Sequence, residues 1–503
     1  MDLLTMKKIV LFLSIALNLA AQDVIIKTSK GAISGTFNPK TNIQKFLGIP
    51  FAKPPVGELR WKAPVPMESW SGIKEAKAFG PSPMQAKPAP FAFWSSEFLI
   101  PESPISEDCL YLNVWAPTSS KGKKSVLVYI YGGGFRSGGA ACPIYDGENM
   151  AQKDIVFVSI NYRVGIFGFL AHPELSTEAP YGSSGNYALL DMIAALKWIK
   201  ENISAFGGDP NQVTIAGQSA GAFAVNFLCA SPLAKGLFQG AIAESGASML
   251  PSPLRPAIKK AQAENNGLEW ATKLGAKSIA DLRAMSAETI QNAGGNASPY
   301  SDGYVLPLPM PEIYAKNLQN DVPILVGWNS EDRLSSKAAE PEAFKATLEK
   351  RFGVRGAEVL AAYGPNGSLD LGRDESFGVQ VHTWAKTQNL QGKASVYVYN
   401  FNRAVPGYDE STRYGAFHTG EVPYAYANLH TVNRPFEAVD QVLSQKMSSY
   451  WVNFTKTGNP NGAGLEVWPT FNVKDQKVLI LDKVIETKEL PTRKTLELLE
   501  TIN

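Results

Sequence analysis

The sequence predicts an α/β fold in which helices cover both faces of one large, mainly parallel central sheet. The first observation is that short runs of β-branched and apolar residues alternate with helical periodicity, which is typical of parallel strands joined by helices. The second is that one such run leads through a Gly-rich turn into a helix, as expected at the carboxyl end of a strand in this architecture. Because no composition break marks a boundary, we expect residues 22–503 to form a single domain.

Residues 1–21 have the pattern of a secretory signal peptide. Two lysines precede an apolar run from 9 to 17, and Ala20 and Ala21 supply the small residues of a cleavage site. A membrane anchor is the alternative, but it needs about 20 apolar residues, and this run stops at Asn18. We therefore expect an exported protein, periplasmic or secreted, with no membrane attachment after the signal is removed.

The composition argues against several classes of partner. A formal net charge of +2 and an isoelectric point near 8.1 give no indication of a nucleic-acid or anionic-membrane partner. The three cysteines, Cys109, Cys142 and Cys229, allow at most one disulfide. Because no cluster of cysteines and histidines has metal-ligand spacing, we expect neither a metal nor another cofactor. No feature indicates an obligatory protein partner.

The elements that build the sheet follow one another along the chain. Strands are expected where β-branched and aromatic residues gather, in 106–115, 125–131, 155–161, 213–215 and 323–326. A helix is expected over 186–206, where five apolar residues recur at helical spacing: Leu189, Ile193, Leu196, Ile199 and Ile203.

An aromatic cluster precedes the first of these strands. Its members are Phe91, Phe93, Trp94 and Phe98, in a Pro-rich irregular segment. Two interpretations stay open: the cluster lines an apolar acyl pocket, or it covers the hydrophobic core.

A glycine loop follows the strand 125–131. Three successive glycines, 132–134, let the backbone turn with its N–H groups unshielded, which suits an oxyanion hole. A phosphate-binding loop is excluded, because neither Gly-Lys-Ser/Thr nor Gly-x-Gly-x-x-Gly spacing is present.

The strand 213–215 leads into Gly217-Gln218-Ser219-Ala220-Gly221 and then into a small apolar run suited to a helix. Strand, Gly-x-Ser-x-Gly and helix together form a nucleophile elbow, in which a tight turn presents the serine hydroxyl at a helix N-terminus. The motif alone would also fit an ordinary Gly-rich turn, so its flanking elements carry the interpretation.

Several segments together resemble the type-B carboxylesterase family, the α/β hydrolases that include cholinesterases, liver carboxylesterases and bacterial para-nitrobenzyl esterases. The segments that carry the resemblance are 46–61, 106–115, 129–138, 161–170, 185–221, 414–423 and 451–468. They span nearly all of the chain after the signal, in the family's order. The resemblance implies the α/β-hydrolase fold and hydrolysis of small-molecule carboxylic esters.

The resemblance also implies the residues of the active site. Ser219 matches the nucleophile, His418 the base and Asp332 the acid, in the chain order Ser, acid, His that this fold uses. The oxyanion hole matches the N–H groups of Gly133, Gly134 and Ala220.

The sequence departs from the family at several positions. The acid segment usually reads Asp-Glu-Gly but here reads Glu331-Asp332-Arg333, so the longer Glu331 stays an alternative acid. Many members have Glu where this chain has Gln218, and the neutral amide argues against cationic choline esters. The family's N-terminal disulfide uses the cysteine that matches Cys109, yet no cysteine precedes it here, so a free thiol is expected.

Family positions of opposite charge imply two buried ion pairs, Arg60 with Glu107 and Arg163 with Asp191. Two rival functions remain. A non-catalytic adhesion relative would lack the serine or the histidine, and both are present. A hydrolase of the same fold that cleaves amides, lactones or polysaccharide-linked acyl groups stays possible, because specificity resides in loops.

Overall fold

The computed structural model describes residues 22–118, 122–295, 297–335 and 337–502. The signal peptide expected over 1–21 lies outside the described residues. Within them, no helix has the length and apolarity that crossing a bilayer requires.

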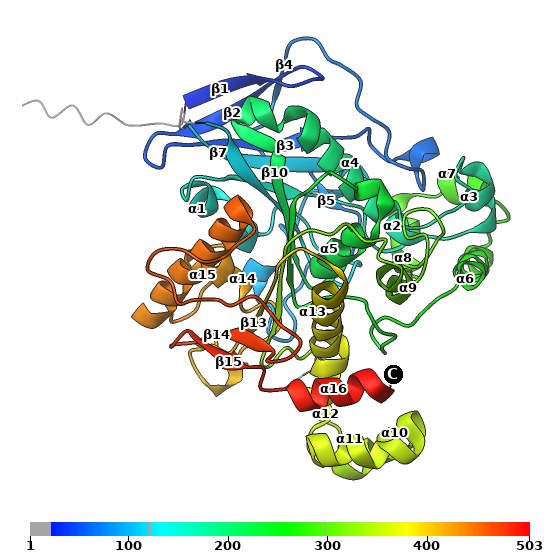
Figure 1. Ribbon diagram of the computed structural model, residues 1–503. Helices are drawn as coiled ribbons and strands as arrows, with labels where there is room; N and C mark the ends of the chain where they lie inside the picture. Colours follow the sequence, from blue (N-terminus) through cyan, green and yellow to red (C-terminus); the bar gives the residue numbers. More distant parts are fainter. Residues whose placement is uncertain (1–21, 119–121, 296, 336, 503) are drawn as a thin grey trace, which may run out of the picture.

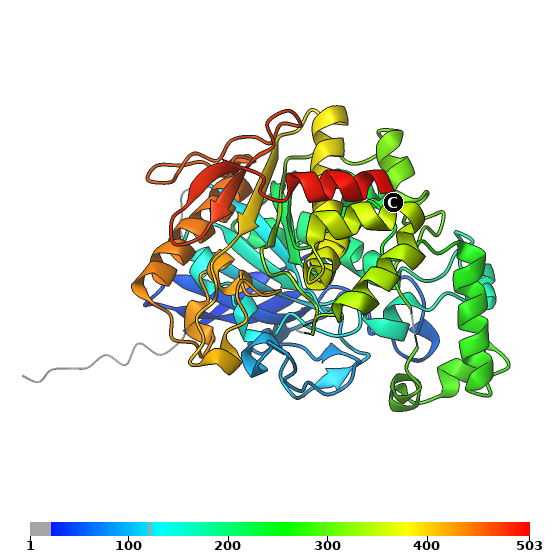
Figure 2. The same ribbon diagram turned by 90° about the horizontal axis from the view of Figure 1, so that it is seen from below.

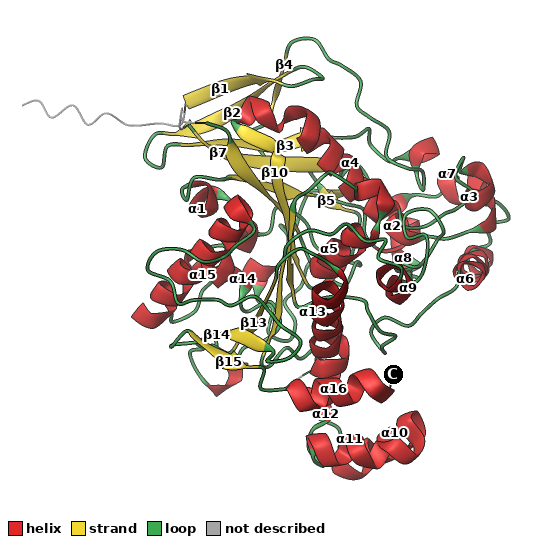
Figure 3. Cartoon of the chain, viewed as in Figure 1, coloured by secondary structure: helices red, strands yellow, loops and turns green. Residues whose placement is uncertain are grey.

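A 13-stranded sheet runs through the described residues and twists strongly from one edge to the other (Figure 3). Its strand order is β1-β2-β3-β7-β9-β8-β10-β11-β12-β13-β14-β15, with β4 paired to β2. The strands are β1 (Gln22–Lys27), β2 (Ala32–Asn38), β3 (Ile43–Pro50), β4 (Ile73–Glu75), β7 (Tyr111–Pro117), β8 (Lys124–Ile130), β9 (Val156–Ile160), β10 (Gly208–Gln218), β11 (Gly240–Glu244), β12 (Ile324–Asn329), β13 (Val396–Phe401), β14 (Lys477–Leu481) and β15 (Glu486–Glu489). A separate short pair joins β5 (Ser82–Pro83) to β6 (Ile105–Ser106).

The centre of the sheet is parallel and its N-terminal edge is antiparallel. From β9 to β14, each strand pairs with its neighbours in parallel register. Along the main strand order from β1 to β9 the pairs are antiparallel, as is the last pair, β14 with β15, whereas the short β4 pairs with β2 in parallel. The prediction of a mainly parallel sheet is confirmed. The antiparallel edge follows from short connections such as 39–42 between β2 and β3, because parallel neighbours need a long crossover.

Helices cover both faces of the sheet, as predicted (Figure 1). One face carries α1 (Glu148–Ala151), α14 (Val422–Ala425) and α15 (Ala438–Thr457). The other face carries α4 (Tyr187–Asn202), α5 (Ala220–Ala230), α9 (Met310–Ala315) and α13 (Val379–Gln391). The helix expected over 186–206 is therefore α4 followed by a 3₁₀ turn, Ile203–Phe206.

The remaining helices form two outer groups. Beyond α5 lie α2 (Gly165–Phe169), α3 (Pro173–Glu178), α6 (Lys260–Lys273), α7 (Ile279–Ala284) and α8 (Ala287–Asn292). Around the far end of α13 lie α10 (Pro341–Phe352), α11 (Gly356–Tyr363), α12 (Ser368–Arg373) and α16 (Arg493–Ile502). Figure 2 shows α16 lying across this second group.

The core is one continuous cluster of buried apolar side chains. The central strands β8, β9, β11 and β12 are buried along their whole length. This accounts for their nearly unbroken apolar sequences, because helices exclude water from both faces.

Candidate active site

Ser219 occupies the sharp turn between β10 and α5. Its backbone has φ 55° and ψ −123°, a conformation that costs a non-glycine residue free energy and recurs at functional sites. The Ser219 N–H donates to the carbonyl oxygen of Glu244 at 2.8 Å, and the Ser219 carbonyl accepts from Phe223 at 2.9 Å. The turn is therefore fixed on one side by β11 and on the other by the first turn of α5.

The glycines that flank Ser219 are required by close backbone packing. A Cβ on Gly221 would lie 2.0 Å from the carbonyl oxygen of Ile130, and a Cβ on Gly217 would lie 2.6 Å from the backbone of Gly221. Neither position accepts a side chain without moving β8 or α5, so the Gly-x-Ser-x-Gly pattern is a packing requirement here.

Hydrogen bonds connect Ser219 to His418 and then to Asp332. His418 Nε2 lies 2.8 Å from Ser219 Oγ, and His418 Nδ1 lies 2.5 Å from Asp332 Oδ1. The other carboxylate oxygen of Asp332 accepts from the Asn329 N–H at 3.1 Å. Asp332 is completely buried, and His418 is 2 % exposed. Ser219 and Asp332 follow the carboxyl ends of β10 and β12, the end at which parallel sheets bind ligands.

Aromatic rings hold the imidazole of His418 in place. Phe377 stacks on it with ring centroids 4.7 Å apart, and Trp94 contacts it edge-on at 6.1 Å. Next to it lies the neutral side chain of Gln218, whose Nε2 is 3.4 Å from His418 Nε2. No carboxylate stands at position 218 to attract a cation.

Glu331 points away from the imidazole. Its Oε2 accepts from the Ala416 N–H at 2.9 Å and from Ser330 Oγ at 2.6 Å. It thus fastens the loop that carries His418, while its neighbour Asp332 contacts the ring. Of the two candidate acids, the structure brings only Asp332 to His418.

The glycine loop lies beside the elbow. Gly133 and Gly134 have φ values of 109° and 65°, which favour glycine. Across the described chain, the N–H groups of Gly133, Gly134 and Ala220 donate to no protein acceptor. All three residues line the same cavity as Ser219. The three sequence-predicted donors are therefore together and available to a ligand.

The cavity in front of Ser219 has a volume of about 570 Å³ and walls that are mainly apolar. Phe91, Trp94 and Phe98 line it, whereas Phe93 is buried against Phe417 with ring centroids 5.3 Å apart. The cluster is therefore divided: three members line the cavity in front of Ser219, and Phe93 covers the core.

Two buried carboxyl groups behind the site were missed by the sequence analysis. Glu244 Oε1 accepts from Tyr426 Oη at 2.6 Å and from Trp451 Nε1 at 2.8 Å, and burial raises the pKa of Glu244 to about 7. Burial, together with the nearby Asp332 and Glu244 carboxyls, raises the pKa of Glu421 well above its usual range. The one signal in the sequence that could have indicated a buried carboxyl group is Glu244 itself, a glutamate at the end of an apolar strand.

No group of three or more His, Cys, Asp or Glu side chains in the described ranges is arranged to hold a metal ion.

A family comparison identifies the chain. The model of the carboxylesterase family matches residues 22–359 and 365–498. The chain belongs to the carboxylesterase family. Its resemblance to these enzymes and the predicted α/β-hydrolase fold are both confirmed, and it is a carboxylic ester hydrolase.

Relatives of this carboxylesterase include two bacterial enzymes. It is 37% identical to the fumonisin B1 esterase of Sphingopyxis macrogoltabida, over 91% of this chain and 87% of that protein. It is 34% identical to the para-nitrobenzyl esterase of Bacillus subtilis, over 93% of this chain and 96% of that protein. A solved structure of a PNB esterase superposes with a TM-score of 0.83 at 33% identity, covering 94% of this chain and 99% of that one.

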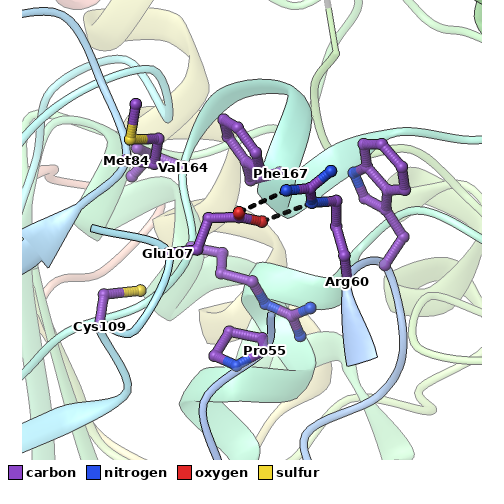
Figure 4. Close-up of a pocket in the computed structure, with 9 residues that line it drawn as sticks. Pro55, Arg60, Met84, Glu107, Cys109, Val164 and Phe167 are labelled. Carbon is purple, nitrogen blue, oxygen red and sulfur yellow. Dashed lines mark hydrogen bonds and ion pairs between the residues drawn. The ribbon is translucent and has the colours of Figure 1, made fainter. Parts of the chain in front are cut away.

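Both ion pairs implied by the resemblance are present in this carboxylesterase. Arg60 binds Glu107 through two hydrogen bonds, of 2.7 and 2.6 Å (Figure 4). Arg163 binds Asp191 in the same way, at 2.8 and 2.7 Å. Arg60 also donates to the carbonyl of Met285 at 2.9 Å, so the pair ties an N-terminal loop to the segment after α7.

Cys109 lies close to these pairs, near Glu107 in Figure 4. It is a free thiol, as predicted, and so are Cys142 and Cys229. Burial, with a further contribution from Asp191, raises the pKa of the Cys109 thiol well above its usual range. The cysteine is therefore a buried, unreactive part of the core.

Proposed function

We propose that this carboxylesterase hydrolyses esters through an acyl-enzyme intermediate, with Ser219 as nucleophile, His418 as general base and Asp332 as orienting acid. The observation that carries the proposal is the line of hydrogen bonds Asp332–His418–Ser219, which opens into an apolar cavity. A serine hydroxyl is a weak nucleophile at neutral pH, so an imidazole within hydrogen-bond reach is the group it needs.

In the first half-reaction, His418 Nε2 takes the hydroxyl proton as Ser219 Oγ attacks the ester carbonyl. The buried Asp332 holds Nδ1–H and stabilises the imidazolium. The imidazolium then gives its proton to the leaving alcohol. In the second half-reaction, water attacks the acyl-enzyme by the same route, and the acid is released.

The oxyanion that forms at the carbonyl is stabilised by the N–H groups of Gly133, Gly134 and Ala220. These donors are preorganised, because the elbow and the glycine loop fix their backbones before substrate arrives. One such donor contributes a rate factor of about 10² to 10³.

The substrates we propose are small-molecule esters with a substantial apolar part. The cavity volume and its aromatic wall support this size and character. The similarity to a fumonisin B1 esterase and a para-nitrobenzyl esterase supports esters of small molecules as the substrate class.

The decisive test is covalent labelling. A fluorophosphonate should add to Ser219 in the wild type, and Ser219→Ala should lose both labelling and nearly all hydrolysis of 4-nitrophenyl esters while keeping its circular dichroism spectrum. Aryl amides of the same acyl group, assayed in parallel, would separate an esterase from an amidase. Full ester hydrolysis by a folded Ser219→Ala variant would exclude the mechanism.

We also propose that the protein is exported, on the basis of the pattern in residues 1–21. Expression of the full chain in a Gram-negative host should place activity in the periplasm or the medium, and the mature protein should begin near residue 22. Activity that stays in the cytoplasm on an uncleaved chain would contradict export.

A further inference from the structure

An arginine without a carboxylate partner lines the cavity in front of Ser219. Arg255 lies in the turn 252–255, after β11, and borders the cavity together with Leu254. The Ser252 N–H donates to the Arg255 carbonyl at 3.2 Å, and the Arg255 N–H donates back to the Ser252 carbonyl at 3.0 Å. Ser252 Oγ accepts from the same N–H at 3.1 Å. The backbone of Arg255 is therefore held firmly.

Two aromatic rings contact the guanidinium. Its Cζ lies 4.6 Å from the ring centroid of Phe135 and 4.9 Å from that of Phe223. Phe135 follows Gly134 in the glycine loop, and Phe223 lies one turn after Ser219 on α5. Arg255 thus stands beside both segments that form the proposed oxyanion hole.

The charge of Arg255 lacks a counter-ion. Its Nε is buried without a hydrogen-bond partner, and no Asp or Glu of the described chain forms an ion pair with it. Burial, and then the nearby Arg136 cation, lower the pKa of Arg255 to about 10. The faces of the two rings attract a cation. They are not hydrogen-bond acceptors for the N–H groups, which point outward in the plane of the guanidinium. Arg255 as a whole is half-buried, and its unpaired guanidinium is a cationic donor in the cavity wall with which a ligand carboxylate would pair favourably.

The charged side chains among the described residues of the cavity wall are both cationic. Lys87 and Arg255 line it, and no Asp or Glu is among the described residues that do so. The position beside the nucleophile carries the neutral Gln218. Such a wall attracts anions and disfavours cationic substrates.

We propose that Arg255 binds a carboxylate carried by the ester, so that the preferred substrates are anionic esters such as half-esters of dicarboxylic acids. The inference rests on the proposed function, because the ester must lie at Ser219 for its carboxylate to reach Arg255. A guanidinium presents two parallel N–H donors that match a carboxylate, which gives the pair its geometric selectivity.

The test compares two substrates that differ only at the end of the acyl chain. Mono-4-nitrophenyl adipate has a terminal carboxylate where 4-nitrophenyl hexanoate has a methyl group. The readout is the ratio of their kcat/KM values in the wild type and in two variants. Arg255→Met keeps an unbranched side chain against the rings, and Arg255→Lys keeps the charge without the planar fork.

We expect the adipate-to-hexanoate ratio to fall about 10- to 100-fold in Arg255→Met, the loss typical of a hydrogen bond to a charged group. The adipate-to-hexanoate ratio of Arg255→Lys should lie between those of the wild type and Arg255→Met. Lys259→Met is the control, because it removes a positive charge from the same segment of chain at an exposed residue that does not line this cavity, and the ratio should change less than about 3-fold in it. Free adipate should inhibit hexanoate hydrolysis competitively in the wild type and far more weakly in Arg255→Met.

If kcat/KM fell equally for both esters in Arg255→Met, the ratio would be unchanged. That result would show that the guanidinium only packs against the rings, and it would overturn the proposal. So would an unchanged ratio with unchanged rates. Failure of the proposed mechanism is distinguished by Ser219→Ala: continued hydrolysis in that variant would reject the nucleophile, whatever Arg255→Met shows.

Discussion

At the scale of single residues, Asp332 and Glu331 are neighbours with different tasks. Asp332→Asn should lower kcat by about 10⁴, because the amide no longer orients and stabilises the imidazolium. Glu331→Gln should lower it less than about 10-fold, because an amide oxygen can still accept from the Ala416 N–H. Steady-state kinetics on 4-nitrophenyl butyrate would measure both. The reverse order of effects would assign the acid to Glu331.

Glu244 gives a second prediction at this scale. Burial raises its pKa from an ordinary 4.5 to about 7, so the folded state binds its proton more tightly than the unfolded state does. Its contribution to stability is therefore present below about pH 4.5 and is lost as the pH rises through about 7. Glu244→Gln does not ionise and should avoid that loss, which is on the order of 3 kcal/mol for a fully buried group.

Urea midpoints measured at pH 5 and pH 8 would check this prediction. Relative to the wild type, the urea midpoint of Glu244→Gln should be higher at pH 8 than it is at pH 5. The exposed Glu58 supplies the control, and Glu58→Gln should show no such shift. If the urea midpoint of Glu244→Gln changed between pH 5 and pH 8 as much as that of the wild type, another group would be responsible for the pH dependence.

At the scale of elements, the pair Arg163–Asp191 connects the segment after β9 to α4. The side chains are 3% and 0% exposed. Arg163→Met should lower the free energy of unfolding by about 3–5 kcal/mol, because Asp191 would stay buried without its partner. The exposed pair Lys316–Glu312 is the control, and Lys316→Met should cost less than about 1 kcal/mol. If urea unfolding showed the same loss of stability in Arg163→Met as in the control variant, burial would not increase the contribution of the pair Arg163–Asp191 to stability.

The helix α16 is anchored through Glu500. Its carboxylate accepts from His382 Nδ1 at 2.9 Å, from Thr383 Oγ1 at 3.0 Å and from Lys386 Nζ at 2.5 Å, all on α13. Burial alone would raise the pKa of Glu500, but His382 and Lys386 outweigh it and lower the pKa to about 2. The anchoring is therefore present above about pH 4.5 and is lost as the pH falls toward 2.

Hydrogen exchange of 493–502 would report this loosening. Amides of α16 should exchange faster at pH 3 than at pH 6 after correction for intrinsic rates, ahead of those in β12. In Glu500→Gln they should exchange fast at both pH values. Protection of α16 that is equal at pH 3 and pH 6 in the wild type would contradict the role of Glu500.

At the scale of the whole molecule, the fold and the elbow could be predicted because their signals are local. A buried parallel strand needs a continuous apolar run, and Gly217 and Gly221 are required by close backbone contacts within the turn and with the adjacent strand. Glu331 and Asp332 could not be separated in this way. Adjacent residues share one sequence signal, and only the path of the loop decides which of them reaches His418.

Arg255 and Glu421 lay beyond sequence reasoning for a different reason. Nothing near Arg255 in the sequence shows that its guanidinium contacts Phe135 and Phe223, since these rings come from two other parts of the chain. The pKa of Glu421 likewise depends on Asp332 and Glu244, which neighbour it only in space. Such features depend on which strand ends the topology brings together.

The hydrogen bonds that connect the site also make activity a measure of folding. Ser219 and His418 are 199 positions apart, and Asp332 and His418 are 86 apart. Contacts between such distant positions form late, because long loops must close before they contribute. No fragment that ends before the His418 loop can hold the complete site. During refolding from urea, ester hydrolysis should therefore return no earlier than the fluorescence change that reports burial of Trp328 on β12 and Trp451 on α15.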